Sequence, residues 1–303
     1  MSANCTIAPD AVPSDAGVAG IGVLLSFMIT AAISLVISAS LILQEARNKS
    51  SSTPLKPSVL RRKLLSSFSD QQILTGIGLQ SVGLAKVTTL VPYHFFLIWM
   101  LSLLSMTVHN ATLLALARDF RRDWVLRWMR QLFMLANLVL SCVYGVYILH
   151  AVQQGLTTFP VACVWESQTP KSPPQRNFAF STTGTIVVIV GNVVFFALGT
   201  CYLHSRAQRF YLFTQVVGWL LMTVFAVVAT VRVAFLADAF GNRTSIKLSD
   251  DDERQWSFGQ LLSVGMLLLP LVTMVEILRD EIKCAPPVAQ EHDDDKAVLL
   301  GEG

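Results

Sequence analysis

Seven long apolar stretches recur along this 303-residue chain, and they limit its possible folds more than any other feature. A membrane-spanning helix needs about 20 predominantly apolar residues, and each stretch reaches that length. Backbone groups in lipid must be paired within the protein, so only helices and closed β-barrels cross a bilayer. The sequence lacks the alternating strands of about ten residues that build a barrel. We therefore predict an all-α, polytopic bundle of seven transmembrane helices at residues 17–43, 70–90, 93–116, 130–152, 178–204, 211–236 and 255–278.

This organisation leaves little room for a separate soluble domain. Residues 1–16 are a segment before the first helix, residues 17–283 are the transmembrane domain, and residues 284–303 are predicted to be a disordered tail. The topology depends on the second helix, which is the least apolar one. Its polar and charged residues are Asp70, Gln71, Gln72, Gln80 and Lys86.

The charged residues predict an orientation for the bundle. They make up only 14% of the chain, against about 25% in soluble domains, and the net charge of +3 gives no indication of nucleic-acid binding. Cytoplasmic loops are enriched in Lys and Arg. Sixteen of these residues lie on the side of the C-terminal tail and five on the other side. We therefore predict a multi-pass protein of the endoplasmic reticulum or plasma membrane, with a lumenal or extracellular N-terminus and a cytosolic C-terminus.

The N-terminal segment carries Asp10 and Asp15 instead of the basic residues of a signal peptide, so the first helix is predicted to be an uncleaved signal anchor. Glycosylation sequons at Asn4 and Asn242 fall on the predicted lumenal side. Cys5 and Cys163 lie on the same side, where they either form a disulfide or remain two free thiols. The cysteine spacings do not match a metal site, and we predict no metal or cofactor.

Polar residues within the predicted helices mark either helix packing or a functional cavity, because they are costly in lipid. Small residues at intervals of four, from Gly22 to Ser38, indicate a packing seam in the first helix. His94 and His109 share one face of the third helix but lie about 22 Å apart along its axis, so they cannot act on the same proton. Each histidine either hydrogen-bonds to a neighbouring helix as part of helix packing or has a chemical role. Hydroxyl and amide groups dominate elsewhere, which favours an amphipathic small molecule over an ion path.

Several functional classes lack their sequence signatures. Residues 256–278 contain no lysine for a retinal Schiff base, and no Asn-Pro-x-x-Tyr motif of rhodopsin-type receptors follows. No phosphate-binding loop, zinc-protease motif or nucleophile elbow is present. The acidic run from Asp250 to Glu253 does not have the spacing of metal-dependent terpene synthases, and we expect it to form a solvated loop.

Local strings resemble a large group of seven-span fungal membrane proteins. The strings are Ser14-Asp15 with Ala19-Gly20-Ile21-Gly22-Val23, Ser69-Asp70-Gln71-Gln72 with Thr75-Gly76, and Tyr93-His94 with Leu101-Ser102 and His109. The resemblance covers mainly the first 120 residues. Some members of that group belong to secondary-metabolite pathways, and polytopic fungal proteins of similar size include terpene and meroterpenoid cyclases. The resemblance therefore implies a membrane enzyme that acts on a prenylated substrate.

Our leading sequence-based hypothesis is a membrane-embedded cyclase or isomerase, in which a carboxylic acid protonates an epoxide or alkene inside a dry cavity. Asp70 and Asp15 are the predicted proton donors. The predicted substrate-binding residues are Tyr93, His94, His109, Asn110 and Gln71. The alternative is a seven-helix receptor or sensor without chemistry, and a structural or trafficking protein is a third possibility.

Overall fold

The computed structural model describes residues 5–50, 58–122, 124–166, 178–204, 211–241 and 248–279. Within these ranges the fold is all-α, apart from an isolated parallel β-bridge between Val12 and Leu248. Two short helices, α1 (Ala16–Ala19) and α5 (Ala117–Arg122), accompany the long ones. The predicted sequons at Asn4 and Asn242 and the predicted tail at residues 284–303 lie outside the described residues.

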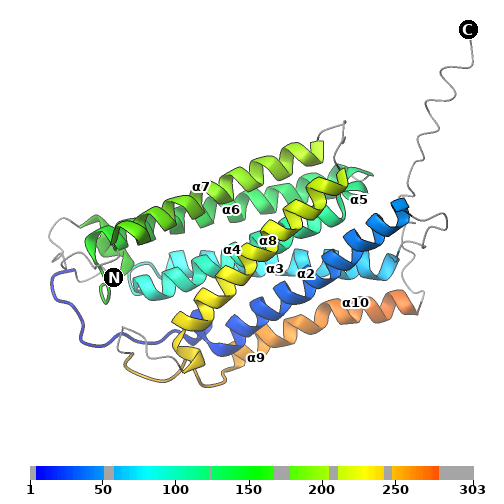
Figure 1. The fold of residues 1–303 in the computed structure, drawn as a ribbon. Helices are drawn as coiled ribbons and strands as arrows, with labels where there is room; N and C mark the ends of the chain where they lie inside the picture. The colour runs from blue at the N-terminus through cyan, green and yellow to red at the C-terminus, as the bar shows by residue number, and fades with distance from the viewer. Residues whose placement is uncertain are drawn as a thin grey trace, which may run out of the picture.

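In the described ranges, seven helical segments run along the bundle and alternate in direction, with the longer helices side by side in Figure 1. They are α2 (Ile21–Ser50), α3 (Val59–Ala85), α4 (Pro92–Ala115), α6 (Trp124–Gln154), α7 (Phe178–His204), α8 (Tyr211–Leu236) and the pair α9 (Phe258–Gly265) and α10 (Leu269–Leu278). Among the described residues, six of these segments are long and apolar enough to cross a membrane. The chain thus has the architecture of a multi-pass helical membrane protein. The remaining segment, α3, is as long but more polar.

The predicted boundaries of the second helix are wrong. We expected a helix over residues 70–90, but α3 begins at Val59, where the Ser58 side chain caps it by accepting a hydrogen bond from the Arg61 N–H. Asp70 therefore lies in the middle of α3 and not near its N-terminus. The predicted start of this helix was too late because the first turns of α3 are basic and resemble a loop.

Helix α4 lies at the centre of the bundle, where it packs against α2, α3, α6, α7 and α8 (Figure 1). Nearly all of its side chains are buried, including Phe95, Trp99 and Leu101. The stripe of small residues on α2 also faces inward, and Ser26, Thr30, Ser34 and Ser38 are all buried. This burial agrees with the packing seam predicted from their spacing.

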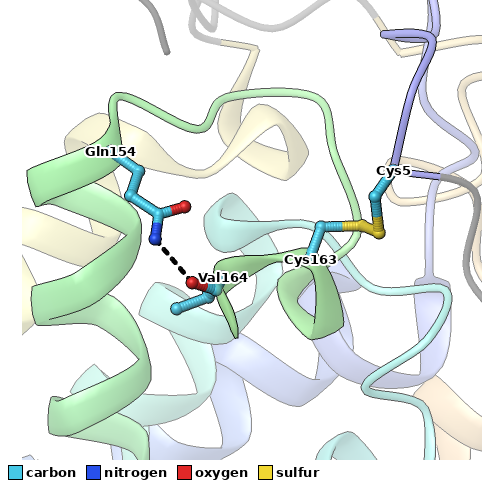
Figure 2. Close-up of a disulfide and its surroundings, with 4 residues drawn as sticks. All are labelled: Cys5, Gln154, Cys163 and Val164. Atoms are coloured by element: carbon cyan, nitrogen blue, oxygen red, sulfur yellow. Dashed lines mark hydrogen bonds between the residues drawn. A yellow bond between two sulfur atoms is a disulfide. The ribbon is translucent and has the colours of Figure 1, made fainter. Parts of the chain in front are cut away.

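The end of the bundle where α4 begins is held together by a disulfide, and we call it the disulfide end. Cys5 and Cys163 are bonded, with their Cα atoms 5.5 Å apart, as Figure 2 shows. Cys163 belongs to the 3-10 helix η1 (Val161–Trp165), and the Gln154 side chain of α6 donates a hydrogen bond to the Val164 carbonyl at 2.5 Å. The covalent bond thus fastens the N-terminal segment to the connection that follows α6.

Replacing both bridged cysteines with serine should lower the stability by about 2–5 kcal/mol, because the bond closes a long loop in the unfolded chain. Thermal unfolding in detergent measures the loss. Cys142→Ser is the matched control, because that cysteine is free and half-buried, and its Tm should change little. An unchanged Tm in the double variant would show that the bond contributes no stability.

Candidate functional site

The structure separates the residues that the sequence analysis grouped into one site. Asp15, Tyr93 and His94 lie at the disulfide end, whereas Asp70 and His109 lie toward the opposite end. Asp15 contacts Lys86, which follows α3 and is sixteen residues from Asp70. This separation corresponds to about 24 Å along a helix axis. The two predicted proton donors therefore do not meet at a common site.

Each of these aspartates already has a cationic partner. Asp15 Oδ2 lies 2.6 Å from Lys86 Nζ, and Asp15 Oδ1 accepts the Gly17 N–H as the N-cap of α1. Asp70 Oδ2 lies 2.5 Å from Arg130 on α6. The same guanidinium also donates to Ser66 and covers the ring of Phe120. Both carboxylates thus act as ion-pair partners between neighbouring segments.

Glu253 forms the most buried ionisable cluster at the disulfide end, and sequence reasoning missed it. Its side chain is 0% exposed, and its Oε1 lies 2.7 Å from His94 Nε2. Tyr93 donates a hydrogen bond to Oε2 at 3.0 Å, and the Tyr93 oxygen in turn accepts the Asp238 N–H at 2.9 Å. The backbone carbonyl of Glu253 also accepts the Ile21 N–H at the start of α2. The cluster therefore joins α4, the start of α2 and the loop before α9.

The interpretation of residues 250–253 as a solvated loop is wrong for Glu253. The three preceding aspartates are exposed as expected, and hydrogen bonds from Ser14 and Ser249 lower the pKa of Asp250. Glu253 is buried because the chain turns inward at this residue. Such a turn depends on tertiary contacts, which composition does not reveal. Within the described ranges, no cluster of His, Cys, Asp or Glu is arranged to hold a metal ion.

Polar side chains of α3 pair with other helices along the middle of the bundle. Gln80 donates to Asn137 Oδ1 at 2.6 Å, and Tyr144 donates to the Gln80 carbonyl at 2.7 Å. Nearer the opposite end, Ser69 Oγ lies 2.9 Å from His109 Nδ1. His109 is 1% exposed, so this contact places it in helix packing between α3 and α4.

A cavity of about 180 Å³ lies between α2, α3 and the last helical segment. Gln71, predicted to bind substrate, lines it together with its neighbour Gln72. Gln72 is 2% exposed and donates to the Phe27 carbonyl at 3.3 Å. The side-chain oxygens of both glutamines are buried without a hydrogen-bond partner among the described residues. Two residues that line the cavity therefore each carry a buried acceptor without a partner among the described residues, which is costly.

The hydroxyl groups around this cavity are also hydrogen-bond acceptors. Their protons are already donated to backbone carbonyls of their own helices, at distances of 2.7–3.1 Å. A hydroxyl has one proton to donate and two lone pairs to accept with, so each retains only acceptor capacity. The residues concerned are Ser26, Thr30, Thr75 and Ser263.

The two parts of the last helical segment pack on different helices beside the cavity. Its first part, α9, packs on α2, and its second part, α10, packs on α3. Between them lies the 3-10 turn η3 (Met266–Leu268), because Pro270 has no N–H to donate to the Met266 carbonyl. Leu262, Ser263 and Met266 form the cavity wall on this segment.

Gln260 anchors α9 to the start of α2. It is 0% exposed, and its amide group accepts the Gly22 N–H at 3.2 Å and donates to the Gln255 carbonyl at 2.9 Å. A Cβ atom at Gly22 would lie 2.7 Å from the Gln260 Cβ. Only glycine at position 22 allows this approach without a shift of the helices.

Comparison of the chain with protein-family models, with curated protein sequences and with solved structures finds no match.

Glu253→Ala should lower the stability by about 3–5 kcal/mol, because it removes a buried charge partner from His94 and Tyr93. The neighbouring exposed Asp251→Ala is the control and should change stability by no more than about 0.5 kcal/mol. Thermal unfolding of both variants at neutral pH provides the comparison. Equal Tm values for the two variants would show that the cluster has no structural role.

Proposed function

We propose that the chain is a seven-helix membrane protein that binds a small uncharged molecule in the cavity between α2, α3 and the last helix, as a receptor-like sensor does. The observation that carries this proposal is the cavity of about 180 Å³, which is lined by hydroxyl groups that can accept hydrogen bonds and by two glutamines with buried, unpartnered oxygens. A cavity of about 150 Å³ is known to accommodate benzene, so the volume suits a small ring or chain.

The inward direction of its polar residues supports α3 as a seventh span. The 27 residues of α3 extend for about 40 Å, which exceeds the roughly 30 Å of a bilayer core. Its polar residues Ser69, Gln72 and Gln80 are buried and paired with other helices instead of facing lipid. Of the basic residues, Arg62, Arg118 and Arg130 cluster at the end opposite the disulfide, which supports that end as cytosolic.

The chemistry of the cavity supports a ligand that donates hydrogen bonds. Its hydroxyl groups can only accept, and no charged side chain is among the described residues that line it. An anion would find no basic side chain there, and a cation would find no carboxylate. A neutral molecule with a hydroxyl or N–H group and an apolar body fits both the polar and the apolar walls.

The acid-catalysed cyclisation expected from the resemblance receives less support from the geometry. Asp15 and Asp70 are each bound to a basic side chain, and neither lines the cavity. A proton donor must come within hydrogen-bond reach of its substrate. Microsomes that convert a farnesylated epoxide only when both aspartates are present would reverse this preference.

Impermeant thiol reagents test the seven-span topology. In a background whose three cysteines outside the disulfide are replaced by serine, Thr89→Cys and Asp251→Cys should react from one side of sealed vesicles. Trp124→Cys, which is 67% exposed at the start of α6, and Arg47→Cys, which is exposed near the end of α2, should react only from the other side. Reaction of Thr89→Cys from the same side as Trp124→Cys would show that α4 does not cross, and reaction from the same side as Arg47→Cys would show that α3 does not.

A matched pair of probes tests the binding site. 4-Hexylphenol should raise the Tm of the purified protein by roughly 5 °C at a hundredfold excess over its Kd, whereas its methyl ether, which cannot donate, should give a much smaller shift. Ser263→Phe fills the cavity and should abolish the response. Leu261→Phe is the control on the exposed face of the same helix and should preserve it. A full response in Ser263→Phe would disprove binding at this site.

A further inference from the structure

We propose that the end of the bundle opposite the disulfide binds the headgroup of an anionic phospholipid at Arg127, with one acyl chain along the exposed face of α6. Residues 131–149 of α6 contain no charged side chain, and Arg127 lies about one turn before them. It is therefore at the depth where lipid headgroups meet the apolar core. Arg127 does not line the cavity beside η3, so the proposal does not depend on ligand binding there.

Arg127 has no carboxylate partner among the described residues. Three other arginines at this end, Arg62, Arg118 and Arg130, each contact a carboxylate. Arg127 is partly exposed, and its Nε atom has no hydrogen-bond acceptor in the described part of the chain. A guanidinium stays charged at physiological pH, and its fork of N–H donors matches a phosphate group. The unmatched charge therefore favours an anionic ligand.

Two exposed tryptophans flank Arg127 on α6. Trp124 and Trp128 are 67% and 56% exposed. The Trp128 ring packs against His204, the last residue of α7, with the ring centroids 5.5 Å apart. Tryptophan is enriched at the interface between membrane and water, because one part of its ring system is apolar and another donates a hydrogen bond. These rings therefore support the placement of Arg127 at the depth of lipid phosphates.

The exposed face of α6 continues from the tryptophans as an apolar stripe. Its next members recur every three or four residues and are 36–63% exposed: Leu132, Leu135, Val139 and Val143. From the first to the last of these residues the helix rises about 16 Å, which is roughly half of the 30 Å core of a bilayer. The stripe thus matches one acyl chain of one leaflet. A phospholipid fills both the stripe and the basic site, whereas a soluble anion fills only the latter.

The local charge favours an anionic headgroup over a zwitterionic one. Residues 117–130 contain five arginines and two aspartates, a net charge of +3. At the disulfide end, residues 249–254 contain three aspartates, one glutamate and one arginine, a net charge of −3. Basic segments beside a membrane attract anionic lipids, and acidic segments repel them. The exposed Arg232 of α8 lies toward the acidic end, so it provides a matched control.

Native mass spectrometry of the full chain in detergent tests the proposal. The probe is dioleoyl phosphatidylglycerol, and dioleoyl phosphatidylcholine is the zwitterionic control with the same chains. The Kd of the first bound phosphatidylglycerol should be about fivefold lower than that of phosphatidylcholine. Glycerol phosphate presents the anion without the chains and should not compete at the same concentration. Equal Kd values for the two lipids would overturn the charge preference, and competition by glycerol phosphate would assign the site to a soluble anion.

Variants locate the site on the chain. Arg127→Gln should raise the Kd of phosphatidylglycerol about fivefold, whereas Arg127→Lys keeps the charge but loses the fork and should give an intermediate value. Arg232→Gln removes an exposed arginine from the other end and should leave the preference unchanged. Thermal unfolding checks that each variant is folded. A preference that survives Arg127→Gln, or is lost equally in Arg232→Gln, would overturn the site.

Salt provides a test that needs no variant. Raising the salt concentration from about 0.05 M to about 0.5 M screens charges near the surface, so the difference in Kd between the two lipids should shrink in the unmodified chain. The Kd of phosphatidylcholine is the internal reference and should change less. A difference that does not depend on salt would contradict recognition by charge.

Discussion

Helix α3 carries polar side chains along much of its length, and each of those that is buried among apolar helices must be matched by another protein group. Ser69 meets His109, Gln72 meets the backbone of α2, and Gln80 meets Asn137. These contacts hold α3 against α2, α4 and α6 and fix its rotation about its own axis. That rotation in turn directs Gln71 and Thr75 toward the last helix and thereby creates the cavity beside η3.

Partly exposed ion pairs occur at both ends of the bundle, but one end has additional contacts. At the disulfide end, a covalent bond and the buried Glu253–His94 contact join the N-terminal segment, α4 and the loop before α9. At the opposite end, exposed or half-buried ion pairs such as Arg62 with Asp119 join neighbouring segments. Exposed pairs contribute little and weaken with salt, whereas a buried charge pair is costly to break. The contacts at the disulfide end are therefore the costlier ones to break.

Sequence reasoning predicted the helical bundle because apolar length is a local property that needs no partner. Six predicted spans agree with helices that could cross a membrane, and burial of the α2 stripe agrees with its small residues at intervals of four. The start of α3, the burial of Glu253 and the separation of Asp15 from Asp70 were not predictable in this way. Each depends on which helices become neighbours. Local sequence patterns do not reveal those long-range contacts.

The proposed binding cavity borders a helical segment that is among the least buried of the bundle. Helices α9 and α10 bury few of their side chains, and Gln260 fastens their first turn, while η3 interrupts the hydrogen-bond ladder beside the cavity. A ligand that bridges Gln71 on α3 and Ser263 on α9 would add contacts only when the last helix is in this position. Binding would then favour that position by the free energy of those contacts. Ligand binding in the polar cavity could thus change the position of the weakly packed last helix.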